Sequence, residues 1–277
     1  MPELPEVETI RSALKPHLTG RSITSVEVRT KKLRRQLIPN LLERELVGRK
    51  IRAVRRRGKF LVLELEQQAA LVIHLGMTGT LRFEPTTAKQ QMHDHIVWQI
   101  CGGDSLVFND SRRFGMVSVQ HLSEPGANPP SLSNMGPEPL ENEFSPQYAW
   151  QHARNRTQPI KNLLLDQRFV AGIGNIYANE ALWRAGISPR RRSCNISRRR
   201  WSLLTTAIKS VLKDAIAVGG TTIRDYRTVD GSEGQFTACL DTYNRGNEPC
   251  HRCRGAHRIR RIVMAGRATY YCPGCQR

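Results

Sequence analysis

Four cysteines near the C-terminus restrict the fold of this 277-residue chain more than any other feature. Cys250 and Cys253 form one C-x2-C pair, Cys272 and Cys275 form a second, and 18 residues separate the two pairs. Tetrahedral zinc takes four soft ligands, and two-residue spacing lets each pair hold one metal ion through a tight turn. Because four thiolates leave no open coordination position, we predict one structural Zn²⁺ without a catalytic role.

Two disulfides between these cysteines are the alternative to zinc. Disulfides are typical of secreted proteins. The N-terminus of this chain lacks the basic region and apolar stretch of a secretory signal. We therefore expect an intracellular protein, in which thiols stay reduced and zinc is the better interpretation.

The charge of the chain indicates a polyanionic partner. Lys and Arg number 43 against 24 Asp and Glu, a formal net charge of +19. Thirteen basic residues lie between Arg29 and Lys59, and arginine triplets follow at 190–192 and 198–200. A solvated surface and an anionic membrane are alternatives, but no basic helix with a large apolar face stands out. Nor does any apolar run reach the roughly 20 residues that span a bilayer. We predict nucleic acid as the partner and no membrane association.

The first half of the chain predicts one helix followed by a β-rich domain. Val7, Ile10, Leu14 and Leu18 repeat at helical spacing, which predicts a helix over residues 4–18. Short apolar runs then alternate with Gly, Asp and Asn, the pattern of strands with turns at 102–104 and 109–113. These runs are 51–54, 60–65, 71–75, 96–100, 106–108 and 116–119. Five prolines and two glycines in 124–139 predict a linker.

The second half reads as helical. One helix should begin at Ile160, and a glycine turn at 171–174 should precede another helix, with Asn175 as its N-cap. A longer helix should run from about Ser197 to Val218 and stop at Gly219-Gly220. Helix, glycine turn and helix resemble a helix-turn-helix variety of DNA-binding module. The backbone N–H groups of such a turn can hold a phosphate.

Met77 and Phe114 lie in turn-like segments, Leu75–Gly79 and Asp110–Gly115. Taken alone, each fits a core position better than a functional one. If exposed, however, apolar side chains on turns can wedge into a base stack. An enzyme that acts on a base must first extract it, and another group must then fill the space.

The N-terminal sequence, with Pro2, Glu3, Pro5, Glu6 and Glu8, also allows two interpretations. Proline and acidic residues in the first helical turn are ordinary helix-start chemistry. The alternative is that these residues carry chemistry, and the rest of the chain decides between the two.

Together these motifs closely resemble the bacterial formamidopyrimidine-DNA glycosylases, which excise oxidised purines. The resemblance covers essentially the whole chain. It rests on the segments Pro2–Glu8, Arg57–Lys59, His74–Met77, Asp110–Gly115, Gly136–Leu140, Gly172–Ala178 and Gly219–Thr222 and on the four zinc-finger cysteines. Many ordered motifs in one chain are far more specific than any of them singly.

The resemblance implies an α+β fold of two domains. The first would be a β-sandwich with an N-terminal helix, and the second a helix-two-turn-helix module that ends in a zinc-finger β-hairpin. We place the catalytic β-sandwich at 1–134, the helix-two-turn-helix part at 135–245 and the zinc finger at 246–277. Double-stranded damaged DNA would lie across a basic cleft, bound by a monomer in the bacterial cytoplasm, associated with the nucleoid through DNA.

The resemblance also implies the roles of individual residues. After removal of Met1, Pro2 would attack C1′ of the damaged nucleotide as a secondary amine, and Glu3 would move protons at the sugar. Glu6 would lie near the lesion base. Phosphate contacts would come from Lys59, His74, Lys161, Asn175 and Arg267. Met77, Arg112 and Phe114 would fill the space left by the extruded nucleotide, with Arg112 facing the orphaned cytosine.

The implied activity is excision of oxidised purines, 8-oxoguanine opposite cytosine and formamidopyrimidines, followed by cleavage of the abasic site by β,δ-elimination. Residues 219–236 resemble the lesion-capping loop of this family. One rival is the endonuclease-eight branch, which acts on oxidised pyrimidines by the same chemistry. Another is a zinc-finger DNA-binding protein without catalysis.

The chain departs from the family pattern at two places. The segment Tyr243–Asn247 has asparagine where the family often has glycine. Since asparagine tolerates the left-handed backbone region, we expect the turn to survive. Thr78 replaces a frequent serine, a mild change.

Overall fold

The structure is a computed structural model and describes residues 2–220 and 239–277. The chain divides into two compact units. One holds the residues up to Ser133 and takes in the chain again from Gly219, and the other holds Asn134–Val218 and the C-terminal segment. No helix in the described ranges is long and apolar enough to cross a membrane.

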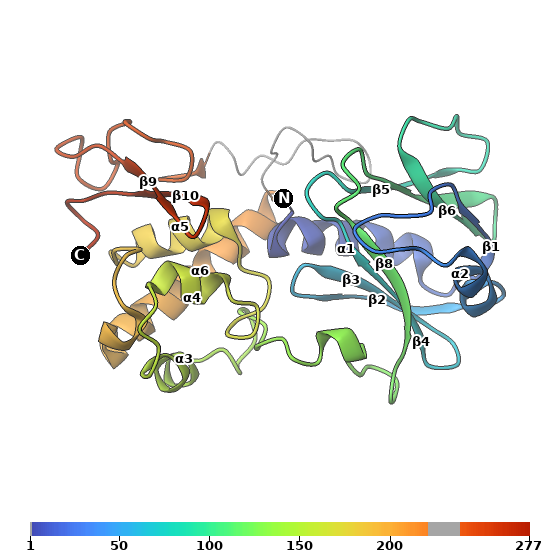
Figure 1. Ribbon diagram of the computed structural model, residues 1–277, viewed down its shortest axis with the longest axis horizontal. Helices are drawn as coiled ribbons and strands as arrows, with labels where there is room; N and C mark the ends of the chain where they lie inside the picture. The colour runs from blue at the N-terminus through green and yellow to red at the C-terminus, as the bar shows by residue number, and fades with distance from the viewer. Residues whose placement is uncertain (1, 221–238) are drawn as a thin grey trace. The chain divides into compact units, whose positions relative to one another are not determined.

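Helix α1 (Leu4–Leu18) opens the N-terminal unit and confirms the helix predicted for 4–18. Glu3 is its N-cap residue, and the Glu6 carboxylate accepts a hydrogen bond of 2.8 Å from the Glu3 N–H. The apolar face of α1 is buried, with Val7 1% exposed and Leu14 fully covered. This face packs against β2 and β3 (Figure 1).

Two antiparallel four-stranded sheets form the rest of this unit. Their strand orders are β1-β6-β7-β5 and β2-β3-β4-β8. The strands are Ile23–Val28 (β1), Ile51–Arg57 (β2), Phe60–Leu65 (β3), Ala69–His74 (β4), Thr80–Pro85 (β5), Asp94–Ile100 (β6), Asp104–Asn109 (β7) and Met116–His121 (β8). Side chains from both sheets and from α1 share one hydrophobic core. The predicted β-sandwich with an N-terminal helix is confirmed.

Six of these strands coincide with the predicted apolar runs. The prediction missed β1, β5, the helix α2 (Pro39–Leu46) and a short 3₁₀ turn, η1 (Pro130–Leu132). Both missed strands lie at the edges of their sheet. An edge strand is partly open to solvent and tolerates charged residues such as Glu27 and Arg82, which interrupt the apolar run.

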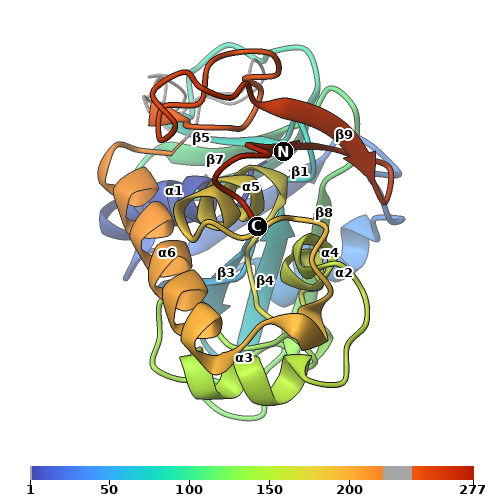
Figure 2. The ribbon, with the colours of Figure 1, turned by 90° about the vertical axis from the view of Figure 1, so that its left-hand side faces the viewer.

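Four helices form the core of the C-terminal unit: α3 (Pro146–Ala153), α4 (Ile160–Leu165), α5 (Asn175–Arg184) and α6 (Arg198–Ala217). A 3₁₀ turn, η2 (Ser193–Asn195), precedes α6, and α6 itself matches the predicted long helix to within one residue at each end. Helix α5 lies beside α6 in both ribbon views (Figure 2). The sequence did not predict α3.

The prediction that Asn175 is an N-cap is wrong. Gly174 is the N-cap residue of α5, with extended backbone angles, and Asn175 is the first residue of the helix. Its side-chain amide does not cap the helix but donates to the Ala268 carbonyl at 3.0 Å. The side chain bonds to a hairpin that is distant in the sequence. Local sequence rules cannot predict such a contact.

A β-hairpin of β9 (Arg260–Met264) and β10 (Arg267–Tyr271) completes the unit. Its two-residue turn has positive φ at both central residues, 47° at Ala265 and 72° at Gly266, as type I′ hairpin turns require. The zinc-bearing hairpin and the helical module preceding it agree with the predicted fold class.

Glu180 of α5 anchors the chain that enters the zinc finger. Its carboxylate is 1% exposed and accepts hydrogen bonds from the N–H groups of Asp241, Thr242 and Tyr243 at 2.9, 3.0 and 2.7 Å. Asn244 follows with φ 63° in the left-handed region. The turn therefore survives with asparagine, as predicted.

Candidate active site and zinc centre

The predicted nucleophile and proton-transfer residue lie in the buried start of the N-terminal unit. Pro2 lies two residues before the start of α1 and is buried, and Glu3, the N-cap residue, is 2% exposed. Glu6, 1% exposed, holds the Glu3 backbone through the hydrogen bond already described. The N-terminus of α1 carries positive partial charge, which favours carboxylates at these positions.

Gly220, the second residue of the predicted capping loop and the last residue of that loop that the structure describes, packs on Glu6. A Cβ atom at Gly220 would lie 2.9 Å from Glu6 Oε1, and its φ of +82° suits glycine. The predicted capping loop continues through residues outside the described ranges. The described part brings its beginning to the carboxylate predicted to lie near the lesion.

Lys59 and His74 lie at the same end of one sheet, Lys59 in a turn and His74 on a strand. Lys59 follows Gly58 in the turn between β2 and β3, and Phe60 pairs with His74 across β3 and β4. Both side chains are nearly covered, Lys59 6% and His74 9% exposed. His74 Nδ1 accepts a hydrogen bond of 3.0 Å from the Gly76 N–H.

His74 is neutral in this environment. Burial, together with the nearby charges of Lys59 and Arg34, lowers the pKa of its imidazole to about 4. Since Nδ1 accepts from Gly76, the ring proton is on Nε2. His74 can therefore offer a phosphate a neutral N–H donor rather than a positive charge. The sequence did not single out Arg34, because only the fold brings it near His74.

This pKa makes the folding stability depend on pH. As pH falls through 6.5, the unfolded chain protonates His74 while the folded chain does not until about pH 4. Stability is thus retained above pH 6.5 and lost toward pH 4. Relative to His74→Gln, the wild type should lose about 3 kcal/mol more between pH 7 and pH 4.

Urea unfolding at a series of pH values measures this difference. His121→Gln is the matched control, because the His121 side chain is 66% exposed, and its curve should follow the wild type. Parallel curves for the wild type and His74→Gln would show that the folded state does not hold His74 neutral.

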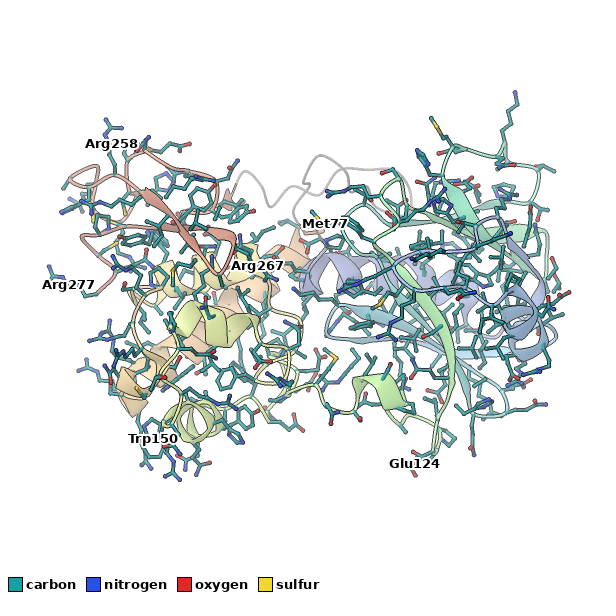
Figure 3. The ribbon with its side chains drawn as sticks, viewed as in Figure 1. Met77, Glu124, Trp150, Arg258, Arg267 and Arg277 are labelled. Carbon is teal, nitrogen blue, oxygen red and sulfur yellow. The ribbon has the colours of Figure 1, made fainter. Side chains whose placement is uncertain are left out.

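Met77, Arg112 and Phe114 are exposed on two turns of the N-terminal unit. The Met77 turn (Leu75–Gly79) joins β4 to β5, and the second loop (Asp110–Gly115) joins β7 to β8. Met77, labelled in Figure 3, is 40% exposed and Phe114 is 42% exposed, which is unusual for large apolar side chains. The Arg112 guanidinium lies over the Phe114 ring at 4.7 Å. A core role for Met77 and Phe114 is therefore excluded.

Two of the predicted phosphate-binding residues of the C-terminal unit share one backbone carbonyl. Lys161 Nζ and Asn175 Nδ2 both donate to Ala268 O at 3.0 Å, and Lys161 also donates to Thr269 Oγ1 at 2.7 Å. Arg267, the preceding residue, is exposed at the start of β10 (Figure 3). The hairpin thus ties residues from α4 and α5 to the neighbourhood of Arg267.

The four C-terminal cysteines form a metal site. Their sulfur atoms all lie within 4.8 Å of one another, with Cys250 and Cys275 at 3.7 Å and Cys253 and Cys272 at 3.5 Å. Zinc–sulfur bonds of about 2.3 Å in a tetrahedron place sulfurs about 3.8 Å apart, so the site fits Zn²⁺. All seven cysteines are free, which removes the disulfide alternative. The four thiolates hold one structural zinc ion.

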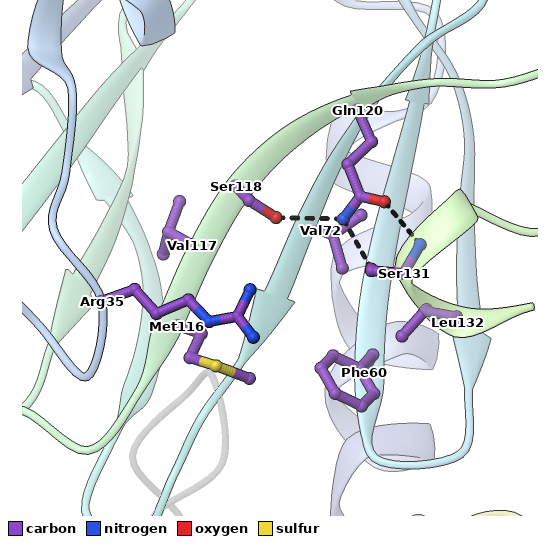
Figure 4. A pocket seen from close by; sticks show the side chains of 9 residues that line it. All are labelled: Arg35, Phe60, Val72, Met116, Val117, Ser118, Gln120, Ser131 and Leu132. Carbon is purple, nitrogen blue, oxygen red and sulfur yellow. Dashed lines mark hydrogen bonds between the residues drawn. The ribbon is translucent and has the colours of Figure 1, made fainter. Parts of the chain in front are cut away.

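A separate pocket of about 120 Å³ lies against the sheet β2-β3-β4-β8 (Figure 4). It contains none of the predicted site residues, although its Phe60 ring lies 4.7 Å from the ring of His74. The amide of Gln120 in its wall is bonded to Ser118 and Ser131, which holds η1 against β8. These contacts serve the fold.

Comparison with known proteins decides the family. The formamidopyrimidine-DNA glycosylase N-terminal domain matches residues 1–117, the H2TH domain of the same enzymes matches 135–227, and a zinc finger found in FPG and IleRS matches 247–277. The chain belongs to the formamidopyrimidine-DNA glycosylase family.

Individual members of the formamidopyrimidine-DNA glycosylase family match over the full length. The chain is 47% identical to the enzyme of Dechloromonas aromatica (strain RCB) over 280 residues, covering all of both chains. A crystal structure of a mutant Lactococcus lactis FPG with DNA containing Fapy-dG matches at TM-score 0.90 and 34% identity, covering 100% of both chains. The structure of the L. lactis Fpg with DNA containing an abasic site also matches at TM-score 0.90 and 34% identity, covering 99% of each chain.

Proposed function

We propose that the chain is a bifunctional glycosylase and abasic-site lyase that removes oxidised purines from double-stranded DNA, above all 8-oxoguanine opposite cytosine and formamidopyrimidines. Family membership makes it an enzyme, a DNA glycosylase of base excision repair, and not a binding module without catalysis. Solved relatives hold DNA with Fapy-dG and with an abasic site, which supports both activities. The name shared by the full-length relatives favours the purine branch over the endonuclease-eight branch.

One observation carries the proposed chemistry: Pro2 and Glu3 lie together at the buried start of α1. Once Met1 is removed, the Pro2 nitrogen is a secondary amine. It attacks C1′, and the bond from C1′ to the base breaks, with its electrons leaving on the base. The Pro2 nitrogen gives up its proton to the departing base. Glu3 then protonates the sugar ring oxygen as the ring opens, which leaves an iminium between Pro2 and C1′.

The iminium then serves as an electron sink. Loss of a proton from C2′ expels the 3′ phosphate, and a second elimination expels the 5′ phosphate. Glu3, a carboxylate with little solvent around it, accepts the proton in one step and returns it in another. Hydrolysis of the iminium releases Pro2 for the next turnover.

Each unit contributes phosphate contacts in this proposal. Lys59 offers a charge and His74 a neutral Nε2–H in the N-terminal unit. In the C-terminal unit the phosphate contacts come from Lys161, Asn175 and Arg267. Lys161 and Asn175 both donate a hydrogen bond to the Ala268 carbonyl, next to Arg267. Charge neutralisation of this kind makes the affinity depend on salt.

Three side chains fill the space of the extruded nucleotide in this proposal. We call Met77, Arg112 and Phe114 the wedge residues and Asp110–Gly115 the wedge loop. Their exposure on short turns supports the role, and the Arg112 side chain can face the orphaned cytosine. Glu6 lies beside the lesion base, where Gly220 brings in the capping segment.

We further propose the domain limits 1–134, 135–245 and 246–277, which the family-model matches support. The zinc finger is thereby a distinct part of the C-terminal unit. The chain would act as a monomer in the bacterial cytoplasm, associated with the nucleoid through DNA. Sedimentation with and without duplex DNA tests the monomer.

Trapping of the covalent intermediate tests the reaction. The enzyme with its native N-terminus is incubated with an 8-oxoguanine:cytosine duplex and cyanoborohydride, which reduces the iminium to a permanent amine link. Peptide mapping by mass spectrometry should place the DNA on Pro2. A link to a lysine would overturn the assignment of the nucleophile, and faster cleavage of an oxidised-pyrimidine duplex would overturn the purine preference.

A further inference from the structure

The two turns that carry the wedge residues are joined by a buried carboxylate. Asp110, the first residue of the wedge loop, is 0% exposed. Its side-chain carboxylate lies between the rest of this loop and the Met77 turn. A carboxylate removed from water needs hydrogen-bond donors around it, and the identity of these donors reveals what Asp110 holds.

The donors come from both turns. Asp110 Oδ1 accepts a hydrogen bond of 2.5 Å from the hydroxyl of Thr78, which belongs to the Met77 turn. The Thr78 oxygen in turn accepts from the backbone N–H of Arg112 at 3.2 Å. Asp110 Oδ2 accepts from the N–H of Gly115 at 2.7 Å, at the end of the wedge loop. One carboxylate and one hydroxyl therefore fix both turns.

The backbones of the two turns also touch directly. A Cβ atom at Gly76 would lie 2.6 Å from Gly115 N and 2.6 Å from Phe114 O. Gly76 also has a φ of +67°, a region that side chains disfavour. The close approach of the Met77 turn to the wedge loop thus depends on glycine at this position.

The sheet fixes Asp110 itself. Its N–H donates to His93 O at 3.1 Å, and its carbonyl accepts from His95 Nε2 at 2.9 Å. His95 is part of β6, in the interior of its sheet. The backbone of Asp110 is therefore held in place, and its carboxylate in turn holds both turns through hydrogen bonds.

We propose that Asp110, acting through the Thr78 hydroxyl, is a positioning residue that makes the Met77 turn and the wedge loop one rigid body. Met77, Arg112 and Phe114 then enter the base stack together. The inference rests on the proposed function, from which it takes the wedge role of these side chains. Two turns that moved separately would each have to be ordered during extrusion, at an entropic cost.

Thr78 offers a matched pair of variants. Thr78→Val removes the hydroxyl and keeps the shape, while Thr78→Ser keeps the hydroxyl. In single-turnover experiments, Thr78→Val should excise 8-oxoguanine from the duplex about tenfold more slowly, as expected for loss of one buried hydrogen bond. Cleavage of a duplex that already holds an abasic site should change less than about twofold, and Thr78→Ser should stay within about twofold on both substrates.

Two further measurements separate positioning from a general effect on stability. A 2-aminopurine next to the lesion brightens when the stack opens, and its signal should rise more slowly with Thr78→Val. Combining Thr78→Val with Met77→Ala should cost little more than the worse single change, since both act on the same step. Thermal unfolding confirms that each variant is folded, and Thr78→Ala replaces Thr78→Val if the valine variant is not.

The outcomes are distinct. Equal losses on the lesion and abasic duplexes, additive losses in the double variant, or unchanged excision by a folded Thr78→Val would each overturn the proposed coupling. Trapping at Pro2 on the abasic duplex serves as the reference in every variant. Normal trapping alongside unchanged excision rejects the coupling alone, whereas failure of the wild type to trap at Pro2 rejects the proposed function.

Discussion

A chain that retains Met1 should form no covalent link to DNA and should lose strand cleavage by on the order of 10³-fold or more, the scale seen when a catalytic nucleophile is removed. With Met1 in place the Pro2 nitrogen is part of a peptide bond, and its lone pair is delocalised into the carbonyl and cannot attack C1′. Binding should persist, because the phosphate contacts assigned to Lys59, Asn175 and Arg267 do not involve the N-terminus. Gel cleavage assays and anisotropy on the same preparation measure the two effects.

The control is a chain made with an N-terminal tag, compared before and after a protease has removed the tag to expose Pro2. Cleavage and trapping should return together, and the mass of the intact protein verifies the state of Met1. Normal cleavage by a chain with a blocked N-terminus would rule out Pro2 as the nucleophile.

Loss of one zinc ligand should have the second large effect. Cys272→Ser should release the metal and disorder the hairpin that presents Arg267, because the finger is too short to bury a sufficient core of its own. We expect DNA affinity to fall by about 10- to 100-fold, equivalent to about 1.4–2.8 kcal/mol. Metal analysis, hydrogen exchange over residues 250–277 and anisotropy at fixed salt measure these changes.

Cys101→Ser is the matched control for the zinc experiment. Cys101 is an exposed free thiol of the N-terminal unit, outside the metal site. Its replacement should leave zinc content and DNA affinity unchanged. A metal-free Cys272→Ser protein with normal binding and cleavage would show that the ion is dispensable.

The fold could be predicted where the signal is local. Helix α1 follows from the spacing of four apolar residues, and the metal site follows from two cysteine pairs that each need only a tight turn. Helix α3 was missed because its eight residues, with Gln147, Trp150 and His152, show no clear apolar repeat. Ser145 as the N-cap and Pro146 in the first turn mark the start of the helix, and packing against α6 supplies the rest.

The candidate site was predictable in its members but not in their states. Family resemblance named His74, but its neutral form follows from burial beside Lys59 and Arg34. Ala268 gave no signal, because its contribution is a backbone carbonyl to which two distant side chains donate. The sequence marked Thr78 only as a mild departure from serine. Threonine and serine both carry a hydroxyl that can donate a hydrogen bond to Asp110, and in the structure Thr78 does so. Each of these facts depends on contacts between segments far apart in the sequence.

The four zinc-binding sulfurs are not chemically equivalent. In each C-x2-C pair one cysteine is buried and the other partly exposed: Cys250 and Cys272 are covered, Cys253 and Cys275 are not. The indole N–H of Trp183 also points at Cys250 Sγ, 3.5 Å away, and withdraws charge from that sulfur. Oxidants and electrophiles therefore reach the sulfur atoms of Cys253 and Cys275 first. Chemical damage to the zinc finger would begin at these two cysteines.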